Sequence, residues 1–383
     1  MTEPVEIEGV VHGGHGLARL EGEVCFVPGA LPGDVVRLGN VTRRRNVLWG
    51  SVETLESPSC HRWEPPCSCA AHATACTWIH FAYPAQAQWK QHIIRDCLAR
   101  IGGLEPELEW RENARYRLGY RTRATFHGDG RSWGFFAPGT KTVMDRASCA
   151  LCHKRLNDAL GQLRSVRLKG SVELTVNPGD GTVLVWTRHP NASLRKVFPR
   201  VNHPRQKAPR GHFLFDGIPV VAGGFSQASL LLNRLLHDAV REIVGDAKSI
   251  LDLYCGSGNL SLPFADTAEV RGLDHNLAAI TAAQRVGKGR YHIGDESAFQ
   301  RALTGEPWDA VLLDPPRSGA RPILNALADC GARKMAYVSC DPATLARDLK
   351  HLTQHGWRLG RVIALDLFPH TPHVETVCEL TPQ

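Results

Sequence analysis

Short apolar runs alternate with helix-like stretches from residue 225 to residue 383, and no other feature constrains the fold of this chain as strongly. Apolar strands separated by helices are typical of a parallel sheet that helices cover. The pattern therefore predicts an α/β domain over 225–383. Its strands are expected at Ser249–Tyr254, Val270–Leu273, Ala310–Leu313, Met335–Val338 and Arg361–Leu367.

The rest of the sequence indicates two further domains, since a chain of 383 residues has room for two or three. Residues 1–56 contain short apolar runs separated by Gly- and Pro-containing turns, which predicts a small β-barrel of the oligonucleotide-binding (OB) type. Residues 57–224 mix strand-like and helical patterns, which predicts a mixed α+β domain. A helix is expected over about 83–101, and it can pack on the C-terminal domain.

Positive charge is in modest excess, with a net charge of +7 and a pI of about 8.8. This balance suits a polyanionic partner but does not require one. It is concentrated at Arg43–Arg45 and in residues 188–212, which carry seven Lys or Arg residues and no acid. The second segment is interrupted by prolines and is expected to be a surface loop. Each could follow a phosphate backbone or simply face solvent.

The N-terminus has neither a basic start nor an apolar stretch of signal-peptide length. No run approaches the roughly 20 apolar residues that cross a bilayer. A cytoplasmic protein without a membrane partner is therefore expected, and most simply a monomer. Twelve cysteines in a reducing compartment point to a metal site or to chemistry rather than to disulfides.

A Gly-x-Gly turn follows the first predicted strand of the C-terminal domain, in residues 250–260 (Ile-Leu-Asp-Leu-Tyr-Cys-Gly-Ser-Gly-Asn-Leu). Such a turn lets the backbone approach a ligand closely. Ser261 replaces the third glycine of a dinucleotide fingerprint, so the turn favours S-adenosylmethionine over NAD. A ligand-free turn with capping acids is the alternative. The expected cofactor contacts are Asp252, Gly256, Gly258, Asp274 for the ribose hydroxyls, and Asp295 near the adenine.

Two motifs at strand ends carry reactive groups. Asp314 begins Asp-Pro-Pro-Arg317 at the end of one buried strand, and Cys340 lies in Val-Ser-Cys-Asp-Pro at the end of the next. Carbon 5 of uracil is a weak nucleophile, but a thiolate that adds to carbon 6 makes it reactive. Cys340 is therefore predicted to be the nucleophile in methylation of carbon 5 of uridine, and an inert buried thiol is the alternative.

Such a reaction also needs a base, because carbon 5 carries a proton that must leave after methyl transfer. Residues 368–375 (Phe-Pro-His-Thr-Pro-His-Val-Glu) supply Glu375 as the candidate. His370 and His373 compete with it, and spacing alone does not separate the three.

Cysteines also concentrate away from this site, which indicates a metal site. The cysteines concerned are Cys60, Cys67, Cys69 and Cys76, with a Cys-x-x-Cys pair at Cys149 and Cys152. The spacing is compatible with zinc and with an iron–sulfur cluster.

Together these motifs resemble the RNA 5-methyluridine (m5U) methyltransferases, and specifically the 23S rRNA branch that carries an N-terminal TRAM domain and a [4Fe–4S] cluster. The likeness covers essentially the whole chain. Its most specific parts are residues 339–348 (Ser-Cys-Asp-Pro-Ala-Thr-Leu-Ala-Arg-Asp), residues 368–375, and the TRAM-like stretch Gly9–Val52. The resemblance implies a Rossmann-like class I methyltransferase domain that uses S-adenosylmethionine.

The resemblance also implies roles for single residues. Cys340 would be the nucleophile and Glu375 the base that removes the proton from carbon 5. Asp314 would contact both the target base and the cofactor. The other implied contacts are Gln227 to the cofactor and Phe225 to the base; Ser229 replaces an asparagine of the family, and that contact is not carried over.

The cysteine motif departs from the family's Cys-x5-Cys-x2-Cys. With Cys76 as its last member, Ala73 occupies the middle position. A longer loop would make Cys60 the first ligand and Cys69 the middle one, with Cys67 as the alternative. Cys149 resembles the distant fourth ligand. The implied ligand set is Cys60, Cys69, Cys76 and Cys149, and a degenerate cluster is the alternative.

The function expected is therefore methylation of carbon 5 of a specific uridine in 23S rRNA through a covalent adduct between Cys340 and carbon 6. The same chemistry on a tRNA uridine is a second reading. A metal-dependent RNA-binding protein without catalysis is a third, and an NAD-dependent oxidoreductase is a fourth.

Overall fold

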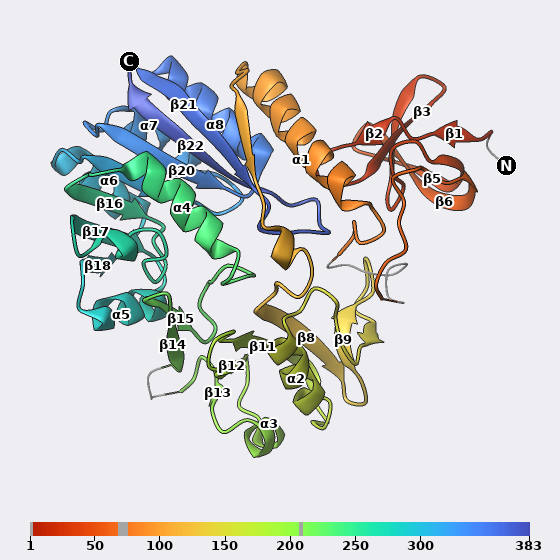
Figure 1. Cartoon of the computed structure of the whole chain (residues 1–383), viewed down its shortest axis with the longest axis horizontal. Helices are drawn as coiled ribbons and strands as arrows, with labels where there is room; N and C mark the ends of the chain where they lie inside the picture. The colour runs from red at the N-terminus through yellow and green to blue at the C-terminus, as the bar shows by residue number, and fades with distance from the viewer. Residues whose placement is uncertain (1–2, 68–75, 207–209) are drawn as a thin grey trace.

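The computed structural model of the chain describes residues 3–67, 76–206 and 210–383. Its C-terminal domain is built on an eight-stranded sheet in the order β18-β17-β16-β19-β20-β22-β21-β7 (Figure 1). Strands β16 to β20 run parallel, and β22 lies antiparallel between β20 and β21. The strands span Ser249–Leu253 (β16), Glu269–Asp274 (β17), Arg290–Ile293 (β18), Ala310–Leu313 (β19), Lys334–Ser339 (β20), Trp357–Leu365 (β21) and Glu375–Pro382 (β22).

Helices cover this sheet, as the alternating sequence pattern predicts, and the α/β prediction is confirmed. Strand β19 is buried along its whole length, which is typical of a strand covered on both faces. Helix α4 buries Leu236, Val240 and Ile243, which recur at helical spacing, against β20, β21 and β22. The helices of this domain are α4 (Asn233–Val244), α5 (Leu277–Val286), α6 (Glu296–Gly305), α7 (Leu324–Ala328) and α8 (Pro342–Gln354).

Two elements from the preceding segment join this domain. Strand β7 (Leu108–Arg111) pairs in parallel with β21 at the edge of the sheet. Helix α1 (Tyr83–Cys97) continues into a π-helical turn (Leu98–Gly102), and both pack on α8. The other side of α1 meets the N-terminal module, where the Trp89 ring lies against Gly9. Helix α1 therefore lies between the N-terminal and C-terminal domains, as Figure 1 shows.

The N-terminal module is a six-stranded sheet in the order β1-β5-β6-β4-β3-β2. Its two edge strands are consecutive in sequence and only two residues apart, so the sheet must curl until its edges approach each other. The described strands form no closed barrel, because β1 and β2 do not pair. The strands are β1 (Val5–Glu6), β2 (Gly9–Val10), β3 (Gly16–Leu20), β4 (Glu23–Val27), β5 (Val35–Arg44) and β6 (Val47–Ser57).

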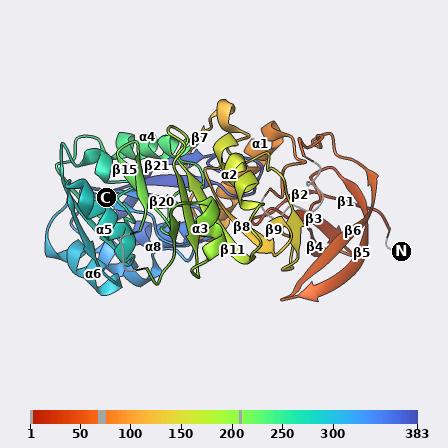
Figure 2. The same ribbon diagram turned by 90° about the horizontal axis from the view of Figure 1, so that it is seen from below.

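The central domain holds a second six-stranded sheet, in the order β10-β9-β8-β11-β12-β13, and the separate hairpin β14-β15. Seen from below, this domain lies in front, between the N-terminal module and the C-terminal domain (Figure 2). Its strands are β8 (Arg123–Asp129), β9 (Trp133–Phe136), β10 (Val143–Asp145), β11 (Lys169–Val176), β12 (Val183–Thr187), β13 (Val201–Asn202), β14 (His212–Phe215) and β15 (Ile218–Val221), and helix α2 spans Lys154–Leu163.

The basic segment 188–212 lies largely at the surface, as predicted, but its described part is not the irregular loop that its prolines predict. Its described part forms α3 (Ala192–Val197) and β13, because Leu194 and Phe198 are buried in the core of the central domain. Residues 207–209 lie outside the described residues. No helix in the described part of the chain is long and apolar enough to span a membrane.

Candidate active site

A cleft of about 780 Å³ opens where the parallel strands of the C-terminal domain end. This is where open α/β sheets bind their ligands, because the loops that follow neighbouring strands meet there. Strand β22 runs antiparallel and therefore begins at the same edge, beside the end of β20. The cleft unites residues far apart in sequence: Phe225, Gln227, Gly256, Asp274, Asp314, Cys340 and Glu375.

The turn after β16 forms one end of the cleft. Asp274, the last residue of β17, accepts hydrogen bonds from the backbone N–H groups of Gly256 (2.8 Å) and Asn276 (2.7 Å), one on each oxygen. Each oxygen keeps a further lone pair that can accept another hydrogen bond. Gly258 has a φ of +84°, and a Cβ there would lie 2.7 Å from the Leu262 side chain, so this position requires glycine.

Asp252, Gly258 and Asp295, all expected to contact the cofactor, are not among the residues that line the cleft. Asp252 is fully buried within β16, where it accepts a hydrogen bond of 2.6 Å from the Ser261 hydroxyl. Ser261, which replaces the third glycine of the dinucleotide fingerprint, is therefore the hydrogen-bond donor to the buried Asp252 carboxyl group. Asp295 is exposed and caps α6 by accepting from Ala298 N–H, and its neighbour Glu296 lines the cleft instead.

Cys340 lies between the end of β20 and the start of α8, and it is half-buried. Burial raises the pKa of its thiol to about 11, and the acids Glu375 and Asp314 add to the rise. The positive charge of Arg317 opposes this rise. The thiol is therefore protonated at neutral pH in the ligand-free protein, and it needs a proton acceptor to become a nucleophile.

Glu375 and Asp314 form a pair of acids beside this thiol. Burial raises the pKa of Asp314 to about 7. Burial and the neighbouring Asp314 hold the pKa of Glu375 well above its ordinary value. The Glu375 atom Oε1 is buried and has no hydrogen-bond partner among the described residues. A buried oxygen without a partner is costly, so this site is built to meet a ligand group.

The structure distinguishes the two histidines, His370 and His373, that compete with Glu375 as the candidate base. His373 lines the cleft, and its Nε2 lies 3.4 Å from Nη2 of Arg317. Burial, followed by the positive charge of Arg317, lowers the pKa of His373 to about 4, so its imidazole is neutral. His370 points away from the cleft and bonds to Gln86 on α1.

The cleft also contains two arginines that sequence reasoning missed, Arg121 and Arg123. The Arg123 guanidinium lies 6.0 Å from the ring centroid of Phe225, the predicted contact to the base, which is 66% exposed. Arg123 also pairs with Glu173 (2.7 Å) across β8 and β11. Arg121 lines the same wall. The alternating basic residues of 120–126 were a usable signal, because they put two arginines on one short strand-like segment.

The cysteines expected to bind a metal differ in burial and do not all lie in the same part of the structure. Cys76, Cys149 and Cys152 are buried in one core cluster. Cys60 is exposed and Cys67 is half-buried, while Cys69 lies outside the described residues. Among the described residues, no group of three or more Cys, His, Asp or Glu is arranged to hold a metal ion. The described thiols alone therefore do not fit a four-cysteine cluster.

Comparison with known proteins places this geometry in context. Residues 300–382 match the family model described as tRNA (Uracil-5-)-methyltransferase, and residues 1–38 match the TRAM domain. The fold resembles that of a Pyrococcus abyssi tRNA (uracil-54, C5)-methyltransferase solved with S-adenosyl-L-homocysteine, with a TM-score of 0.78. That match covers 99% of this chain and 100% of the other at 24% identity.

Curated relatives are similar over more than nine tenths of their lengths. The chain is 32% identical to a 23S rRNA (uracil(1939)-C(5))-methyltransferase RlmD of Pseudomonas aeruginosa, over 97% of this chain and 92% of that protein. It is 30% identical to the protein of the same name from Alkalilimnicola ehrlichii, over 98% of this chain and 96% of that protein. The predicted family and the predicted N-terminal TRAM domain are confirmed, and the chain belongs to the family of RNA uracil-C5 methyltransferases that includes these RlmD proteins.

Proposed function

We propose that this protein uses S-adenosylmethionine to methylate carbon 5 of one uridine in 23S rRNA, the equivalent of uridine 1939. The observation that carries the proposal is the convergence of Cys340, Asp314 and Glu375 in one cleft with the Gly256 turn. The same uridine is named in the RlmD relatives, which align over nearly the whole chain.

Residues at the turn suit the methyl donor. Asp274 can accept from the ribose hydroxyls with its remaining lone pairs, and Gln227 and Asn276 lie in the same cleft. The volume of about 780 Å³ exceeds what one nucleoside needs and leaves room for a flipped base. When bound, S-adenosylmethionine supplies an electrophilic methyl group.

The residues of the chain act on the uracil ring. The Cys340 sulfur forms a bond to carbon 6, and the electrons of the carbon 5–carbon 6 double bond move toward O4, which makes carbon 5 nucleophilic. The thiol proton passes to the Asp314–Glu375 pair, which then releases a proton to solvent so that Glu375 is ionised. After methylation, the Glu375 carboxylate takes the proton from carbon 5, the double bond re-forms, and the bond from sulfur to carbon 6 breaks to return the thiolate.

Replacing the nucleophile tests this scheme. Cys340→Ala is expected to abolish formation of 5-methyluridine in an rRNA fragment while leaving S-adenosylmethionine binding intact by calorimetry. Cys330→Ala, at a buried thiol outside the cleft, is the matched control and is expected to keep full activity. Undiminished turnover by the Cys340→Ala variant would contradict the covalent mechanism.

The substrate is tested separately, because a tRNA could use the same chemistry. Purified protein is given 23S rRNA fragments and tRNA transcripts, and methylated uridines are mapped by mass spectrometry. Methylation confined to the fragment that contains uridine 1939 is expected. Methylation of tRNA alone would replace 23S rRNA as the substrate.

The proposal places the protein in the cytoplasm as a monomer, and it includes a [4Fe–4S] cluster as a structural group only. Cys76 and Cys149 would be two of its ligands, with Cys60 and Cys69 (or Cys67) completing the set. No catalytic step runs through it. Iron and labile-sulfide analysis of protein purified without oxygen tests it, and about four irons per chain are expected. Less than one iron per chain would contradict it.

A further inference from the structure

The loop of residues 366–374 connects β21 to β22 and carries His373 into the cleft. It contains no helix or strand, so contacts with other parts of the chain must determine its shape. Those contacts come mainly from α1 and the turn before it, which lie more than 270 residues earlier in the sequence (Lys90 and Asp366 are 276 residues apart).

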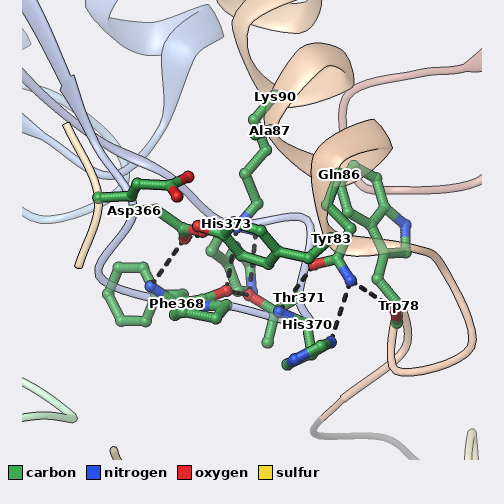
Figure 3. Close-up of polar contacts among 12 residues, drawn as sticks. Trp78, Tyr83, Gln86, Ala87, Lys90, Asp366, Phe368, His370, Thr371 and His373 are labelled. Atoms are coloured by element: carbon green, nitrogen blue, oxygen red, sulfur yellow. Dashed lines mark hydrogen bonds and ion pairs between the residues drawn. The ribbon is translucent and has the colours of Figure 1, made fainter. Parts of the chain in front are cut away.

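Lys90 and Asp366 form an ion pair at the centre of this contact. Lys90 Nζ lies 2.7 Å from Asp366 Oδ1, and both side chains are completely buried. The ammonium group also donates to the Phe368 carbonyl (3.0 Å), and the Tyr83 hydroxyl donates to Asp366 Oδ2 (2.7 Å). Figure 3 shows Lys90 reaching from α1 toward Asp366 and the loop. A buried ion pair is poor evidence of stabilisation by itself, and its best-supported use is to fix one arrangement.

A second set of hydrogen bonds holds the next turn of the loop. His370 N–H donates to Gln86 Oε1 (2.9 Å), and Trp78 N–H donates to the His370 carbonyl (3.2 Å). The Tyr120 hydroxyl donates to the Pro369 carbonyl (3.0 Å). His370 has a φ of +63°, a left-handed conformation that non-glycine residues keep only where the surroundings determine it.

The position of Glu375 depends on this arrangement. In the pairing of β21 with β22, Glu375 lies opposite Leu365, and Asp366 follows Leu365 directly. The Glu375 atom Oε1 accepts no hydrogen bond from the described residues that would hold it in place. The backbone therefore sets the direction of the Glu375 carboxylate. The buried pair of Lys90 and Asp366 fixes that backbone at the residue next to Leu365, the strand partner of Glu375.

We propose that Lys90, through its ion pair with Asp366, is a positioning residue that places Glu375 for removal of the proton from carbon 5. This inference rests on the proposed function. Lys90 touches neither the cleft nor the substrate, so its loss affects the step that Glu375 performs rather than binding. A misplacement of about 1 Å in a catalytic group can cost about 10²-fold in rate.

Lys90→Met tests the inference, because methionine keeps the apolar stem and removes the ammonium group. The expected result is a fall in kcat of about 10²-fold with unchanged KM for S-adenosylmethionine and for the rRNA fragment. The adduct between Cys340 and RNA forms but resolves slowly, so a denaturant-resistant protein–RNA band accumulates. Arg95→Met is the matched control, since it removes one positive charge from the exposed face of the same helix and is expected to change neither quantity.

Lys90→Met leaves Asp366 buried without its partner, and this variant could fail to fold. In that case the double variant Lys90→Met/Asp366→Leu, which removes both charges, is used for the test. Tyr83→Phe is a milder variant, because it removes only the hydrogen bond from Tyr83 to the Asp366 carboxylate. Thermal unfolding close to that of the wild type, together with the same accumulation of adduct, supports the inference. Wild-type kcat without adduct in the folded double variant overturns it.

Failure of this inference is distinguishable from failure of the proposed function. If Glu375→Gln accumulates the adduct and the folded Lys90 variants do not, only the positioning role is wrong. If wild-type protein forms no Cys340-dependent adduct and no 5-methyluridine, the proposed function itself is wrong.

Discussion

The Cys340 thiol shares its cleft with Asp314 and Glu375, and the three groups determine one another's protonation. Burial raises the pKa of all three, and each negative charge makes the next one harder to form. The thiol proton therefore needs an acceptor within this group. The acid that gains its charge first is Asp314, whose pKa is raised only to about 7.

The rate of methylation is expected to rise with pH because of this acceptor. Well below pH 7 the Asp314–Glu375 pair is protonated, and each step up in pH toward and through about 7 increases the fraction that can take the thiol proton. A profile of kcat/KM against pH should climb up to about pH 7 and flatten above it. Asp314→Asn should remove the inflection. A flat wild-type profile between pH 5.5 and about 8 would contradict this assignment.

Asp252 gives a second pH effect, on stability. Burial raises its pKa from 3.8 to about 8, so the folded protein favours the protonated form. That contribution to folding is complete at low pH and is lost as the pH rises through about 8. Asp252→Asn should therefore reduce the fall in Tm between pH 6 and about 9, by roughly 2–4 °C for each kcal/mol recovered.

Thermal unfolding followed by circular dichroism at several pH values measures this effect. Asp246→Asn, at an exposed position in the turn after α4, is the control and should follow the wild type. Parallel Tm curves for the wild type and Asp252→Asn would show that the buried acid does not titrate as expected.

Among the elements, the turn between β2 and β3 of the TRAM domain joins two catalytic loops. His12 Nε2 lies 3.3 Å from Asp341 Oδ2, next to the nucleophile. The Gly14 carbonyl accepts a hydrogen bond of 3.0 Å from Trp78 Nε1, and its Cα faces Pro372. The TRAM domain is thus attached directly to the loops that carry Cys340 and His373.

Gly14→Ala should disturb this attachment, because a Cβ there would lie 2.6 Å from the Pro372 ring and φ is +83°. The expected result is a lower Tm and a several-fold loss of methylation. Gly22→Ala is the matched control, since its φ of +85° is equally unfavourable but nothing lies within 4 Å of the added methyl group. Equal losses in both variants would mean that backbone strain alone is responsible.

The sequence predicted the elements whose signal is local. Strands such as Ala310–Leu313 are continuous apolar runs, and the structure has them with the same bounds. The pairing of β7 with the C-terminal sheet could not be predicted from local sequence, because its partner β21 lies some 250 residues further on (Trp110 pairs with Ala364). The pair of Lys90 and Asp366 was missed for the same reason. In segment 188–212, two buried apolar residues outweigh the prolines and charges that predict a loop.

At the scale of the whole molecule, a second groove of about 540 Å³ continues from the cleft across the central sheet. The two share Thr125 and Glu173 in their linings. The groove is lined by basic and polar side chains, including Lys169, Arg188 and His189. RNA on either side of the target uridine could follow this path, since Lys and Arg contacts to phosphates carry no sequence requirement.

Lys169→Ala/Arg188→Ala is expected to weaken binding of the rRNA fragment and to lower the slope of log affinity against log salt by about one to two. Binding of S-adenosylmethionine should not change. Arg290→Ala is the control, because this exposed arginine lies on β18 and pairs with Glu269 at 3.2 Å. An unchanged salt slope in the double variant, measured by filter binding, would exclude the groove as the RNA path.

The pairing of β7 with β21 has a consequence for synthesis of the chain. A ribosome adds about 5–20 residues per second, so β7 emerges roughly 12–50 s before the strand it pairs with exists. During that interval β7 and the inner face of α1 have no native partner to bury them. A protein fragment of residues 225–383 alone would lack β7, so β21 would be an exposed edge strand that can pair with other chains. Residues 83–111 and the C-terminal domain must therefore be present together for the eight-stranded sheet to be completed.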